Sequence, residues 1–301
     1  MAIEFSRVIS SRRNASGGAF SAQAVDLRAL GAWSSPVLVL DQFRVTGRPF
    51  PPHPHAGFSA ATYVFADSQC GVRSRDSLGN DLVTGPGGIV WTEAGRGLLH
   101  EEVPAETGHE LHAVQIFVNL SAKNKLLAPR LLRLDGAEVR EWRNTAGDRV
   151  RVVVGSFDGT SSPITPAEPF NLLDAQLQNE ISFVLPEAHS SLIYVLLGRA
   201  RVCTEDHEQQ EIGGEQALAL HGSGRVSLQA IRPTHLLILL GAEIHEPLVE
   251  YGGFIMNDRS QVVATIERFQ SGQMGHLEPI SKTEDEVQLA SVQKTKPNMG
   301  L

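Results

Sequence analysis

The sequence predicts an all-β protein made of two barrels stacked in tandem, with a short helix near the C-terminus. Runs of β-forming residues alternate with glycine- or proline-containing turns at the spacing of roughly 8–12 residues that is typical of sandwiches and barrels. The order of proline turn, apolar strand, hairpin and closing strand in the first half recurs in the second half, which indicates an internal repeat of two barrels. Residues 260–270 instead have apolar positions at helical spacing.

The first half supplies the strands of one barrel. Residues 1–30 predict two strands joined by a turn, and the next strands are expected at 36–43, 58–65, 89–91 and 111–120, with a strand followed by a tight turn over 72–80. Between them, the proline-rich segment 47–52 cannot be helical, because proline restricts its own backbone and that of the preceding residue. This segment leads the chain directly into His53.

The second half repeats the pattern and sets the expected domain boundaries. Strands are predicted at 138–142, 150–155, 170–174, 181–186, 191–198, 199–204, 216–220 and 236–241, followed by the helix, which Gly272 terminates. We therefore expect an N-terminal barrel over residues 1–137, a C-terminal barrel over 138–277 and a loosely held polar tail over 278–301.

Composition restricts the class of protein. The chain has 301 residues, of which 42% are hydrophobic and 20% charged, as in a soluble globular protein. The net charge of −8 argues against a nucleic-acid partner. Cys70 and Cys203 are too few for a disulfide framework, which favours a reducing compartment. Since no signal peptide and no long apolar run are present, we expect a cytoplasmic protein with no membrane partner.

Two short motifs predict a metal site in the first barrel. Side chains two apart on a strand share a face, so His53 and His55 point the same way, as do His100 and Glu102. If the two strands are neighbours, three imidazoles and one carboxylate converge on one divalent transition metal. This set leaves coordination positions open, which suits Fe(II), with Mn, Co, Ni, Cu or Zn as alternatives. Glu102 is also the expected catalytic residue, as the acceptor of a proton from a metal-bound hydroxyl.

The residues around these motifs resemble a known family. Residues 53–58 (HPHAGF) and 94–102 (AGRGLLHEE) are similar to the pirins, which are two-domain members of the cupin superfamily. Residues 75–80 (RDSLGN), 115–120 (QIFVNL) and 246–257 (EPLVEYGGFIMN) resemble further pirin segments in the same order. The resemblance implies two cupin (jelly-roll) barrels with one metal in the N-terminal barrel, whose ligands fall on His53, His55, His100 and Glu102.

The resemblance implies two alternative functions. Some bacterial pirins are quercetin 2,3-dioxygenases, so one expectation is an enzyme that opens the ring of a flavonol, or of a related small aromatic substrate, with O2. Other pirins are described as metal-dependent regulators, so the alternative is a regulatory or redox-sensing protein that binds a protein partner. O2 consumption by the iron-loaded protein in the presence of quercetin would distinguish the two.

The sequence departs from the family pattern at several positions near the motifs. These are Ala56, Ser59, Ser74 and Glu93, and we expect them to alter the pocket rim and the residues around the ligands. The absence of a carboxylate at Ser59 leaves Glu102 as the metal carboxylate. Glu101 is expected to face away from the metal as a rim or solvated residue. Gln115 is considered as a hydrogen-bond donor to a ligand, and Phe58, Trp91 and Phe117 as pocket or core aromatics. Pocket roles for His109 and His112 stay open, and no metal is expected in the second barrel.

Overall fold

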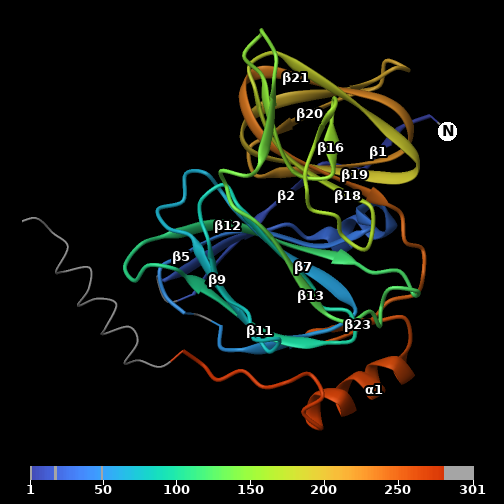
Figure 1. The fold of residues 1–301 in the computed structure, drawn as a ribbon. Helices are drawn as coiled ribbons and strands as arrows, with labels where there is room; N and C mark the ends of the chain where they lie inside the picture. The colour runs from blue at the N-terminus through green and yellow to red at the C-terminus, as the bar shows by residue number, and fades with distance from the viewer. Residues whose placement is uncertain (1, 17–18, 49, 281–301) are drawn as a thin grey trace, which may run out of the picture.

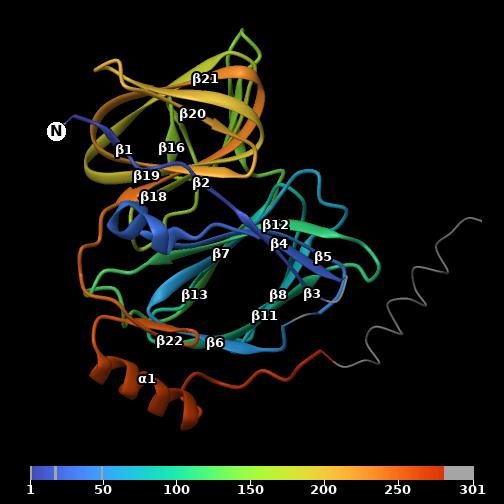
Figure 2. The same ribbon diagram turned by 180° about the vertical axis from the view of Figure 1, so that it is seen from behind.

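The computed structural model describes residues 2–16, 19–48 and 50–280, and it confirms two antiparallel β-barrels and a short C-terminal helix (Figure 1). The C-terminal barrel lies on top of the N-terminal barrel, and the helix lies beneath the N-terminal barrel in both views (Figures 1 and 2). No helix among the described residues is long and apolar enough to cross a membrane. Of the tail predicted over 278–301, residues 281–301 lie outside the described part of the chain.

The N-terminal barrel is built from two antiparallel sheets. The larger has the order β13-β10-β7-β12-β5-β4-β3 and consists of β3 (Arg12–Ser16), β4 (Phe20–Ala24), β5 (Val37–Val45), β7 (Phe58–Val64), β10 (Ile89–Glu93), β12 (Leu111–Asn119) and β13 (Arg130–Leu134). The smaller has the order β6-β11-β8-β9 and consists of β6 (His53–His55), β8 (Val72–Asp76), β9 (Asp81–Thr84) and β11 (Leu98–Pro104). The larger sheet packs against the C-terminal barrel, and the smaller sheet carries both predicted metal motifs.

The C-terminal barrel is one eight-stranded antiparallel system. Its path β14-β15-β18-β21-β19-β20 consists of β14 (Arg140–Arg143), β15 (Arg149–Val154), β18 (Phe170–Leu177), β19 (Glu180–Thr204), β20 (Gln209–Gly213) and β21 (Gln216–Ala242). The runs predicted as separate strands at 181–186, 191–198 and 199–204 are joined in β19. Gly198 makes the bend in β19 possible, because its φ is +98° and a side-chain carbon there would lie 2.3 Å from the Pro233 carbonyl oxygen.

Several short elements lie outside the two main barrel sheets. A 3-10 helix, η1 (Leu27–Ser34), precedes β5, and two small hairpins are formed by β16 (Ser156–Phe157) with β17 (Thr160–Ser161) and by β22 (Val249–Tyr251) with β23 (Phe254–Met256). The helix α1 (Arg259–Gln270) confirms the prediction for 260–270, and the Asp258 side chain caps it by accepting a hydrogen bond from the Gln261 amide at 2.8 Å.

Two segments lie with the barrel at the other end of the chain. Strands β1 (Glu4–Phe5) and β2 (Ile9–Ser10) pair with β21 of the C-terminal barrel. The hairpin β22–β23 and helix α1 pack under the N-terminal barrel, where Phe254, Met256 and Val262 bury Ala56. The boundaries at 137 and 277 stay a prediction, but a cut at 137 would separate both segments from the barrels they contact.

The two barrels share a hydrophobic core and a buried polar cluster. Trp91 of the first barrel packs on Phe170 of the second, with ring centroids 5.5 Å apart. Beside this contact, the Tyr63 hydroxyl donates to Asp174 at 2.6 Å, and Asp174 also lies 2.5 Å from Nε2 of His235. Since Tyr63 comes from β7 and the other two residues from β18 and β21, this cluster joins the barrels.

Replacing Asp174 with asparagine is expected to lower the free energy of unfolding by about 2–3 kcal/mol, because it breaks a buried ion pair while keeping a hydrogen-bonding side chain. Burial alone would raise the pKa of Asp174, but His235, Tyr63 and Arg151 together outweigh burial and hold that pKa below 3.8. Burial alone would lower the pKa of His235, but Asp174 raises it above 6.5.

The lowered pKa of Asp174 and the raised pKa of His235 determine how the stability that this ion pair contributes depends on pH. The part due to Asp174 is present above pH 3.8 and is lost as the pH falls through its lowered pKa. The part due to His235 is present below pH 6.5 and is lost as the pH rises through its raised pKa. Urea unfolding across this range should show a stability maximum that the asparagine variant flattens. Asp81→Asn, at an exposed ion pair, is the control, and equal midpoints for all three proteins would contradict the prediction.

Candidate metal centre

Antiparallel pairing of β6 with β11 brings the two motifs together, which meets the condition that the sequence analysis set for a shared site. His55 lies opposite Leu98, and His53 lies opposite His100. Alternation along β6 then places His53 and His55 on one face, and the register places His100 on that same face. The three histidines are therefore fixed by the backbone pairing of the smaller sheet and not by a flexible loop.

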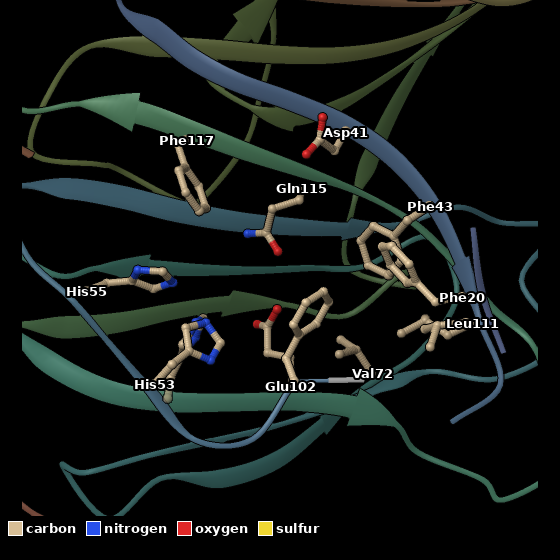
Figure 3. Close-up of a pocket in the computed structure, with 13 residues that line it drawn as sticks. Phe20, Asp41, Phe43, His53, His55, Val72, Glu102, Leu111, Gln115 and Phe117 are labelled. Atoms are coloured by element: carbon tan, nitrogen blue, oxygen red, sulfur yellow. The ribbon is translucent and has the colours of Figure 1, made fainter. Parts of the chain in front are cut away.

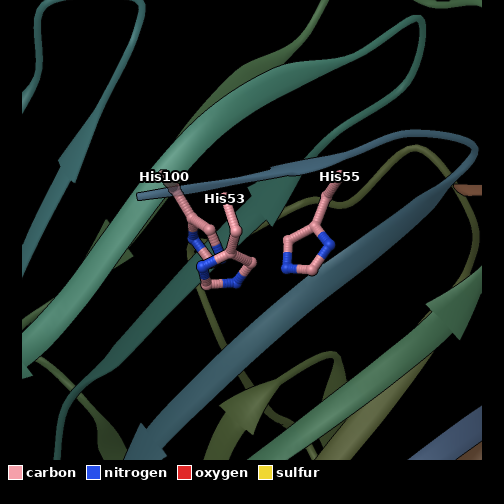
Figure 4. A group of neighbouring side chains, drawn as sticks. All are labelled: His53, His55 and His100. Atoms are coloured by element: carbon pink, nitrogen blue, oxygen red, sulfur yellow. The ribbon is translucent and has the colours of Figure 1, made fainter. Parts of the chain in front are cut away.

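The three imidazoles form a compact group (Figure 4). Their ring centroids lie 4.6–4.8 Å apart, and one nitrogen from each lies within 4.8 Å of the others. Within residues 2–16, 19–48 and 50–280, this is the one group of three or more histidine, cysteine or carboxylate side chains close enough to hold a metal ion. A cluster of this kind has the donor atoms that a divalent transition metal requires.

The electrostatics of the group suit metal binding. Burial, together with the neighbouring His53, lowers the pKa of His55 to about 3, and burial lowers the pKa of His100 well below 6.5. Both rings are therefore neutral at physiological pH, as metal ligands must be. The Nδ1 of His53 lies 2.9 Å from the Pro51 carbonyl oxygen, so that this nitrogen carries the proton and Nε2 is free to bind metal. The buried Nδ1 of His100 has no hydrogen-bond partner among the described residues, which fits a site that a cation would complete.

Glu102 lies in the same cavity as the histidines, but it is not part of the close group. Its carboxylate accepts a hydrogen bond from the Thr62 hydroxyl at 2.5 Å. Burial raises the pKa of Glu102 to about 7, against the opposing effect of that hydrogen bond. Its roles as fourth metal ligand and as proton acceptor stay predictions.

Glu101 corrects one expectation. It does face away from the histidines, but it is only 3% exposed and forms an ion pair with Arg75 at 3.0 Å. Arg75 in turn donates to the carbonyl of Glu278 at 3.2 Å, so the C-terminal segment covers this outer face of the sheet. Glu101 is therefore a buried structural residue and not a solvated one.

The cavity above the histidines has a volume of about 250 Å³ and is lined mainly by aromatic and aliphatic side chains (Figure 3). Its aromatic walls come from Phe20, Phe43, Phe50 and Phe117. Besides the three histidines, its polar lining consists of Asp41, Glu102 and Gln115. A concave, largely apolar site with a few convergent polar groups is the usual form of a small-molecule pocket.

The other residues considered from the sequence fall into two groups. Gln115 lines the cavity, and its Oε1 lies 3.3 Å from the Thr62 hydroxyl that contacts Glu102. Outside the cavity lining are Trp91 in the shared core, Phe58 against the His55 ring, His112 against Asp67 and Gln42, and the half-exposed His109.

Most of the positions that depart from the family pattern lie outside the cavity lining. Ser74 lies opposite Glu102 in the β8–β11 pair, as expected for a residue that surrounds the site. Ala56 is instead buried under the C-terminal segment, Ser59 is buried on β7, and Glu93 is paired with Arg130 at 2.5 Å. None of these three lines the cavity, so the expectation that they alter its rim is wrong.

The loop after His55 is held by contacts that the sequence does not predict. The Lys125 side chain is 1% exposed, and its ammonium donates to the carbonyls of Gly57 at 2.8 Å and Ile255 at 3.0 Å and to the Asn119 side chain at 2.5 Å. Ala56 also pairs with the β22–β23 hairpin, donating to the Gly253 carbonyl at 3.1 Å. No local sequence pattern marks Lys125, and the resemblance of residues 246–257 to a pirin segment does not place them against Ala56.

Comparison with family models gives two matches. The model described as Pirin matches residues 22–118, and the model described as Pirin C-terminal cupin domain matches residues 172–275. The first match falls within the N-terminal barrel, and the second covers most of the C-terminal barrel together with the β22–β23 hairpin and α1.

Curated relatives and solved structures agree with these matches. A Pseudomonas aeruginosa protein named "Putative quercetin 2,3-dioxygenase" is 33% identical over 250 residues, which cover 79% of this chain and 86% of that protein. The rat protein named Pirin is 30% identical over 246 residues, covering 80% and 82%. A crystal structure of quercetin 2,3-dioxygenase from Acinetobacter baumannii has a TM-score of 0.80 at 26% identity, covering 91% of this chain and 99% of that one. A bacterial pirin from Escherichia coli in complex with nickel(II) has a TM-score of 0.61 at 18% identity, covering 80% and 99%.

Proposed function

This chain belongs to the pirin family, and we propose that its N-terminal barrel is a metal-dependent dioxygenase site that opens the ring of a flavonol or a related small hydroxylated aromatic with O2. The observation that carries the proposal is the group of three histidines at the base of a cavity with aromatic walls. Relatives named as quercetin 2,3-dioxygenases support the reaction class. We propose Fe(II) as the metal, with Mn, Co, Ni, Cu or Zn as alternatives.

The protein's own residues have separate tasks in this proposal. His53, His55 and His100 would hold the metal, with Glu102 as the fourth ligand. When bound, the metal supplies a Lewis acid that lowers the pKa of a substrate hydroxyl. The aromatic walls orient a planar ring by stacking and keep water away from it. Glu102, which Thr62 orients, accepts the hydroxyl proton.

O2 uptake tests the proposal directly. Protein purified without added metal is loaded with Fe(II), its metal content is measured, and O2 consumption is followed after quercetin is added. Uptake that requires both the metal and the flavonol is the expected result. A fully loaded protein that takes up no O2 with quercetin or simpler catechol-like aromatics would refute the proposal and favour the regulatory alternative.

Replacing Glu102 with glutamine is expected to lower turnover by about a hundredfold, because glutamine cannot accept the proton. Most of the metal should remain bound, because the three imidazoles are unchanged. Glu106→Gln is the control, since Glu106 is exposed and lies outside the cavity lining. Steady-state O2 uptake and metal analysis check both parts, and full activity of the Glu102 variant would remove Glu102 from the mechanism.

A further inference from the structure

One wall of the cavity carries a carboxylate that the proposed reaction does not use. Asp41 on β5 pairs with Gln115 on β12 across the larger sheet, so that both side chains enter the cavity on the wall away from His53 (Figure 3). Asp41 is half-buried, and its carboxylate has no hydrogen bond or ion pair to any described residue. Burial raises its pKa above 3.8, so the carboxylate is poorly hydrated. A partly desolvated acceptor without a protein partner gains from a donor on a ligand.

The charges of the lining determine which ligand suits this wall. No lysine or arginine is among the described residues that line the cavity, whereas Asp41 and Glu102 are both carboxylates. A ligand that is held by the metal at one end and places its own carboxylate beside Asp41 at the other would bring like charges together in a confined apolar space, which is unfavourable. A neutral ligand with a hydroxyl group avoids that repulsion and supplies the missing donor.

We infer that Asp41 is a specificity-determining residue. Its carboxylate accepts a hydrogen bond from a substrate hydroxyl group that lies away from the end of the substrate bound to the metal. This contact selects neutral polyhydroxylated aromatics against aromatic carboxylates. This inference rests on the proposed function, because it takes the metal as the site that holds the other end of the substrate. A hydrogen bond to a charged acceptor corresponds to a preference of roughly tenfold or more.

Two ligands with the same catechol head provide the test. Binding of 3,4-dihydroxybenzyl alcohol and of 3,4-dihydroxybenzoate is measured by calorimetry on nickel-loaded protein without O2, so that the readout is affinity and not turnover. The native protein should bind the alcohol at least about tenfold more tightly than the carboxylate. In Asp41→Asn the alcohol should bind several-fold more weakly and the carboxylate more tightly, because the amide has no charge and can donate.

The control separates Asp41 from its surroundings. Asp26 lines a neighbouring surface groove that Asp41 also borders, but it does not line the metal cavity, so Asp26→Asn should keep the native preference. If both ligands bind and Asp41→Asn leaves their ratio unchanged, the inference is wrong while the proposed function stands. The ratio in the native protein is a second check that needs no variant, and equal affinities there would also overturn the inference. If neither ligand binds, the inference is wrong, and O2 uptake with quercetin decides the proposed function separately.

Discussion

Replacing His100 with alanine is expected to lower the affinity of the N-terminal barrel for nickel(II) by more than about a hundredfold. Loss of a residue that only supports a ligand already costs about 10–100-fold, so loss of one imidazole of three should cost more. The metal-free protein should remain folded, because Nδ1 of His100 has no hydrogen-bond partner among the described residues and no buried partner is left unpaired. Calorimetric titration with nickel(II), with thermal unfolding of the metal-free protein, measures both effects.

A second histidine of the same barrel provides the matched control. His112 is buried like His100, but it lies on the face of the larger sheet that points away from the metal cavity. Its Nδ1 lies 2.8 Å from the Asp67 carboxylate, and its Nε2 lies 2.9 Å from the Gln42 side-chain nitrogen. His112→Ala should therefore destabilise the fold while leaving the nickel affinity of the remaining folded protein unchanged. Native affinity in His100→Ala, or equal losses in the two variants, would show that the three histidines are not the site.

The metal motifs and the single helix could be predicted because their geometry is local. Alternation along a strand is enough to place His53 and His55 on one face, and apolar spacing is enough to predict α1. The meeting of His100 with His53 is different, because it depends on the pairing of two strands whose residues are 47 positions apart in the chain (100 − 53 = 47). The family resemblance, and not local spacing, supplied that information.

Other features could not be predicted because they depend on tertiary contacts. Alternation gave the correct direction for Glu101, but its burial depends on Arg75 and on chain near Glu278. Asp41 looks like an ordinary residue of a buried strand, and its unpaired carboxylate becomes visible only when the cavity is known. The β22–β23 hairpin supports the loop after His55 through residues that are about 200 positions apart in the chain. Sequence periodicity gives no signal at that separation.

Replacing Lys125 with methionine is expected to lower the free energy of unfolding by about 3–5 kcal/mol. Methionine has a similar length, but it removes a charged group whose three donors match three buried acceptors on Gly57, Asn119 and Ile255. Those oxygens lose their donor, and the close approach of Gly57 leaves little space for water, since a side-chain carbon at Gly57 would lie 1.9 Å from the Ile255 carbonyl oxygen. Urea unfolding measures this loss.

The same variant should also weaken metal binding, because Gly57 follows the ligand His55 by two residues and the lost contacts hold that turn against the C-terminal hairpin. A decrease in nickel affinity of roughly tenfold is expected in the fraction that remains folded, which is the size of effect seen when support of a ligand is lost. Lys123→Met is the matched control, since Lys123 lies two residues away in the same segment and is exposed. The prediction is wrong if Lys125→Met has the same urea midpoint as the native protein. The buried ammonium would then not be needed to hold the turn at Gly57 against the β22–β23 hairpin. Unchanged nickel affinity in a destabilised variant would instead show that the β6–β11 pairing alone positions His55.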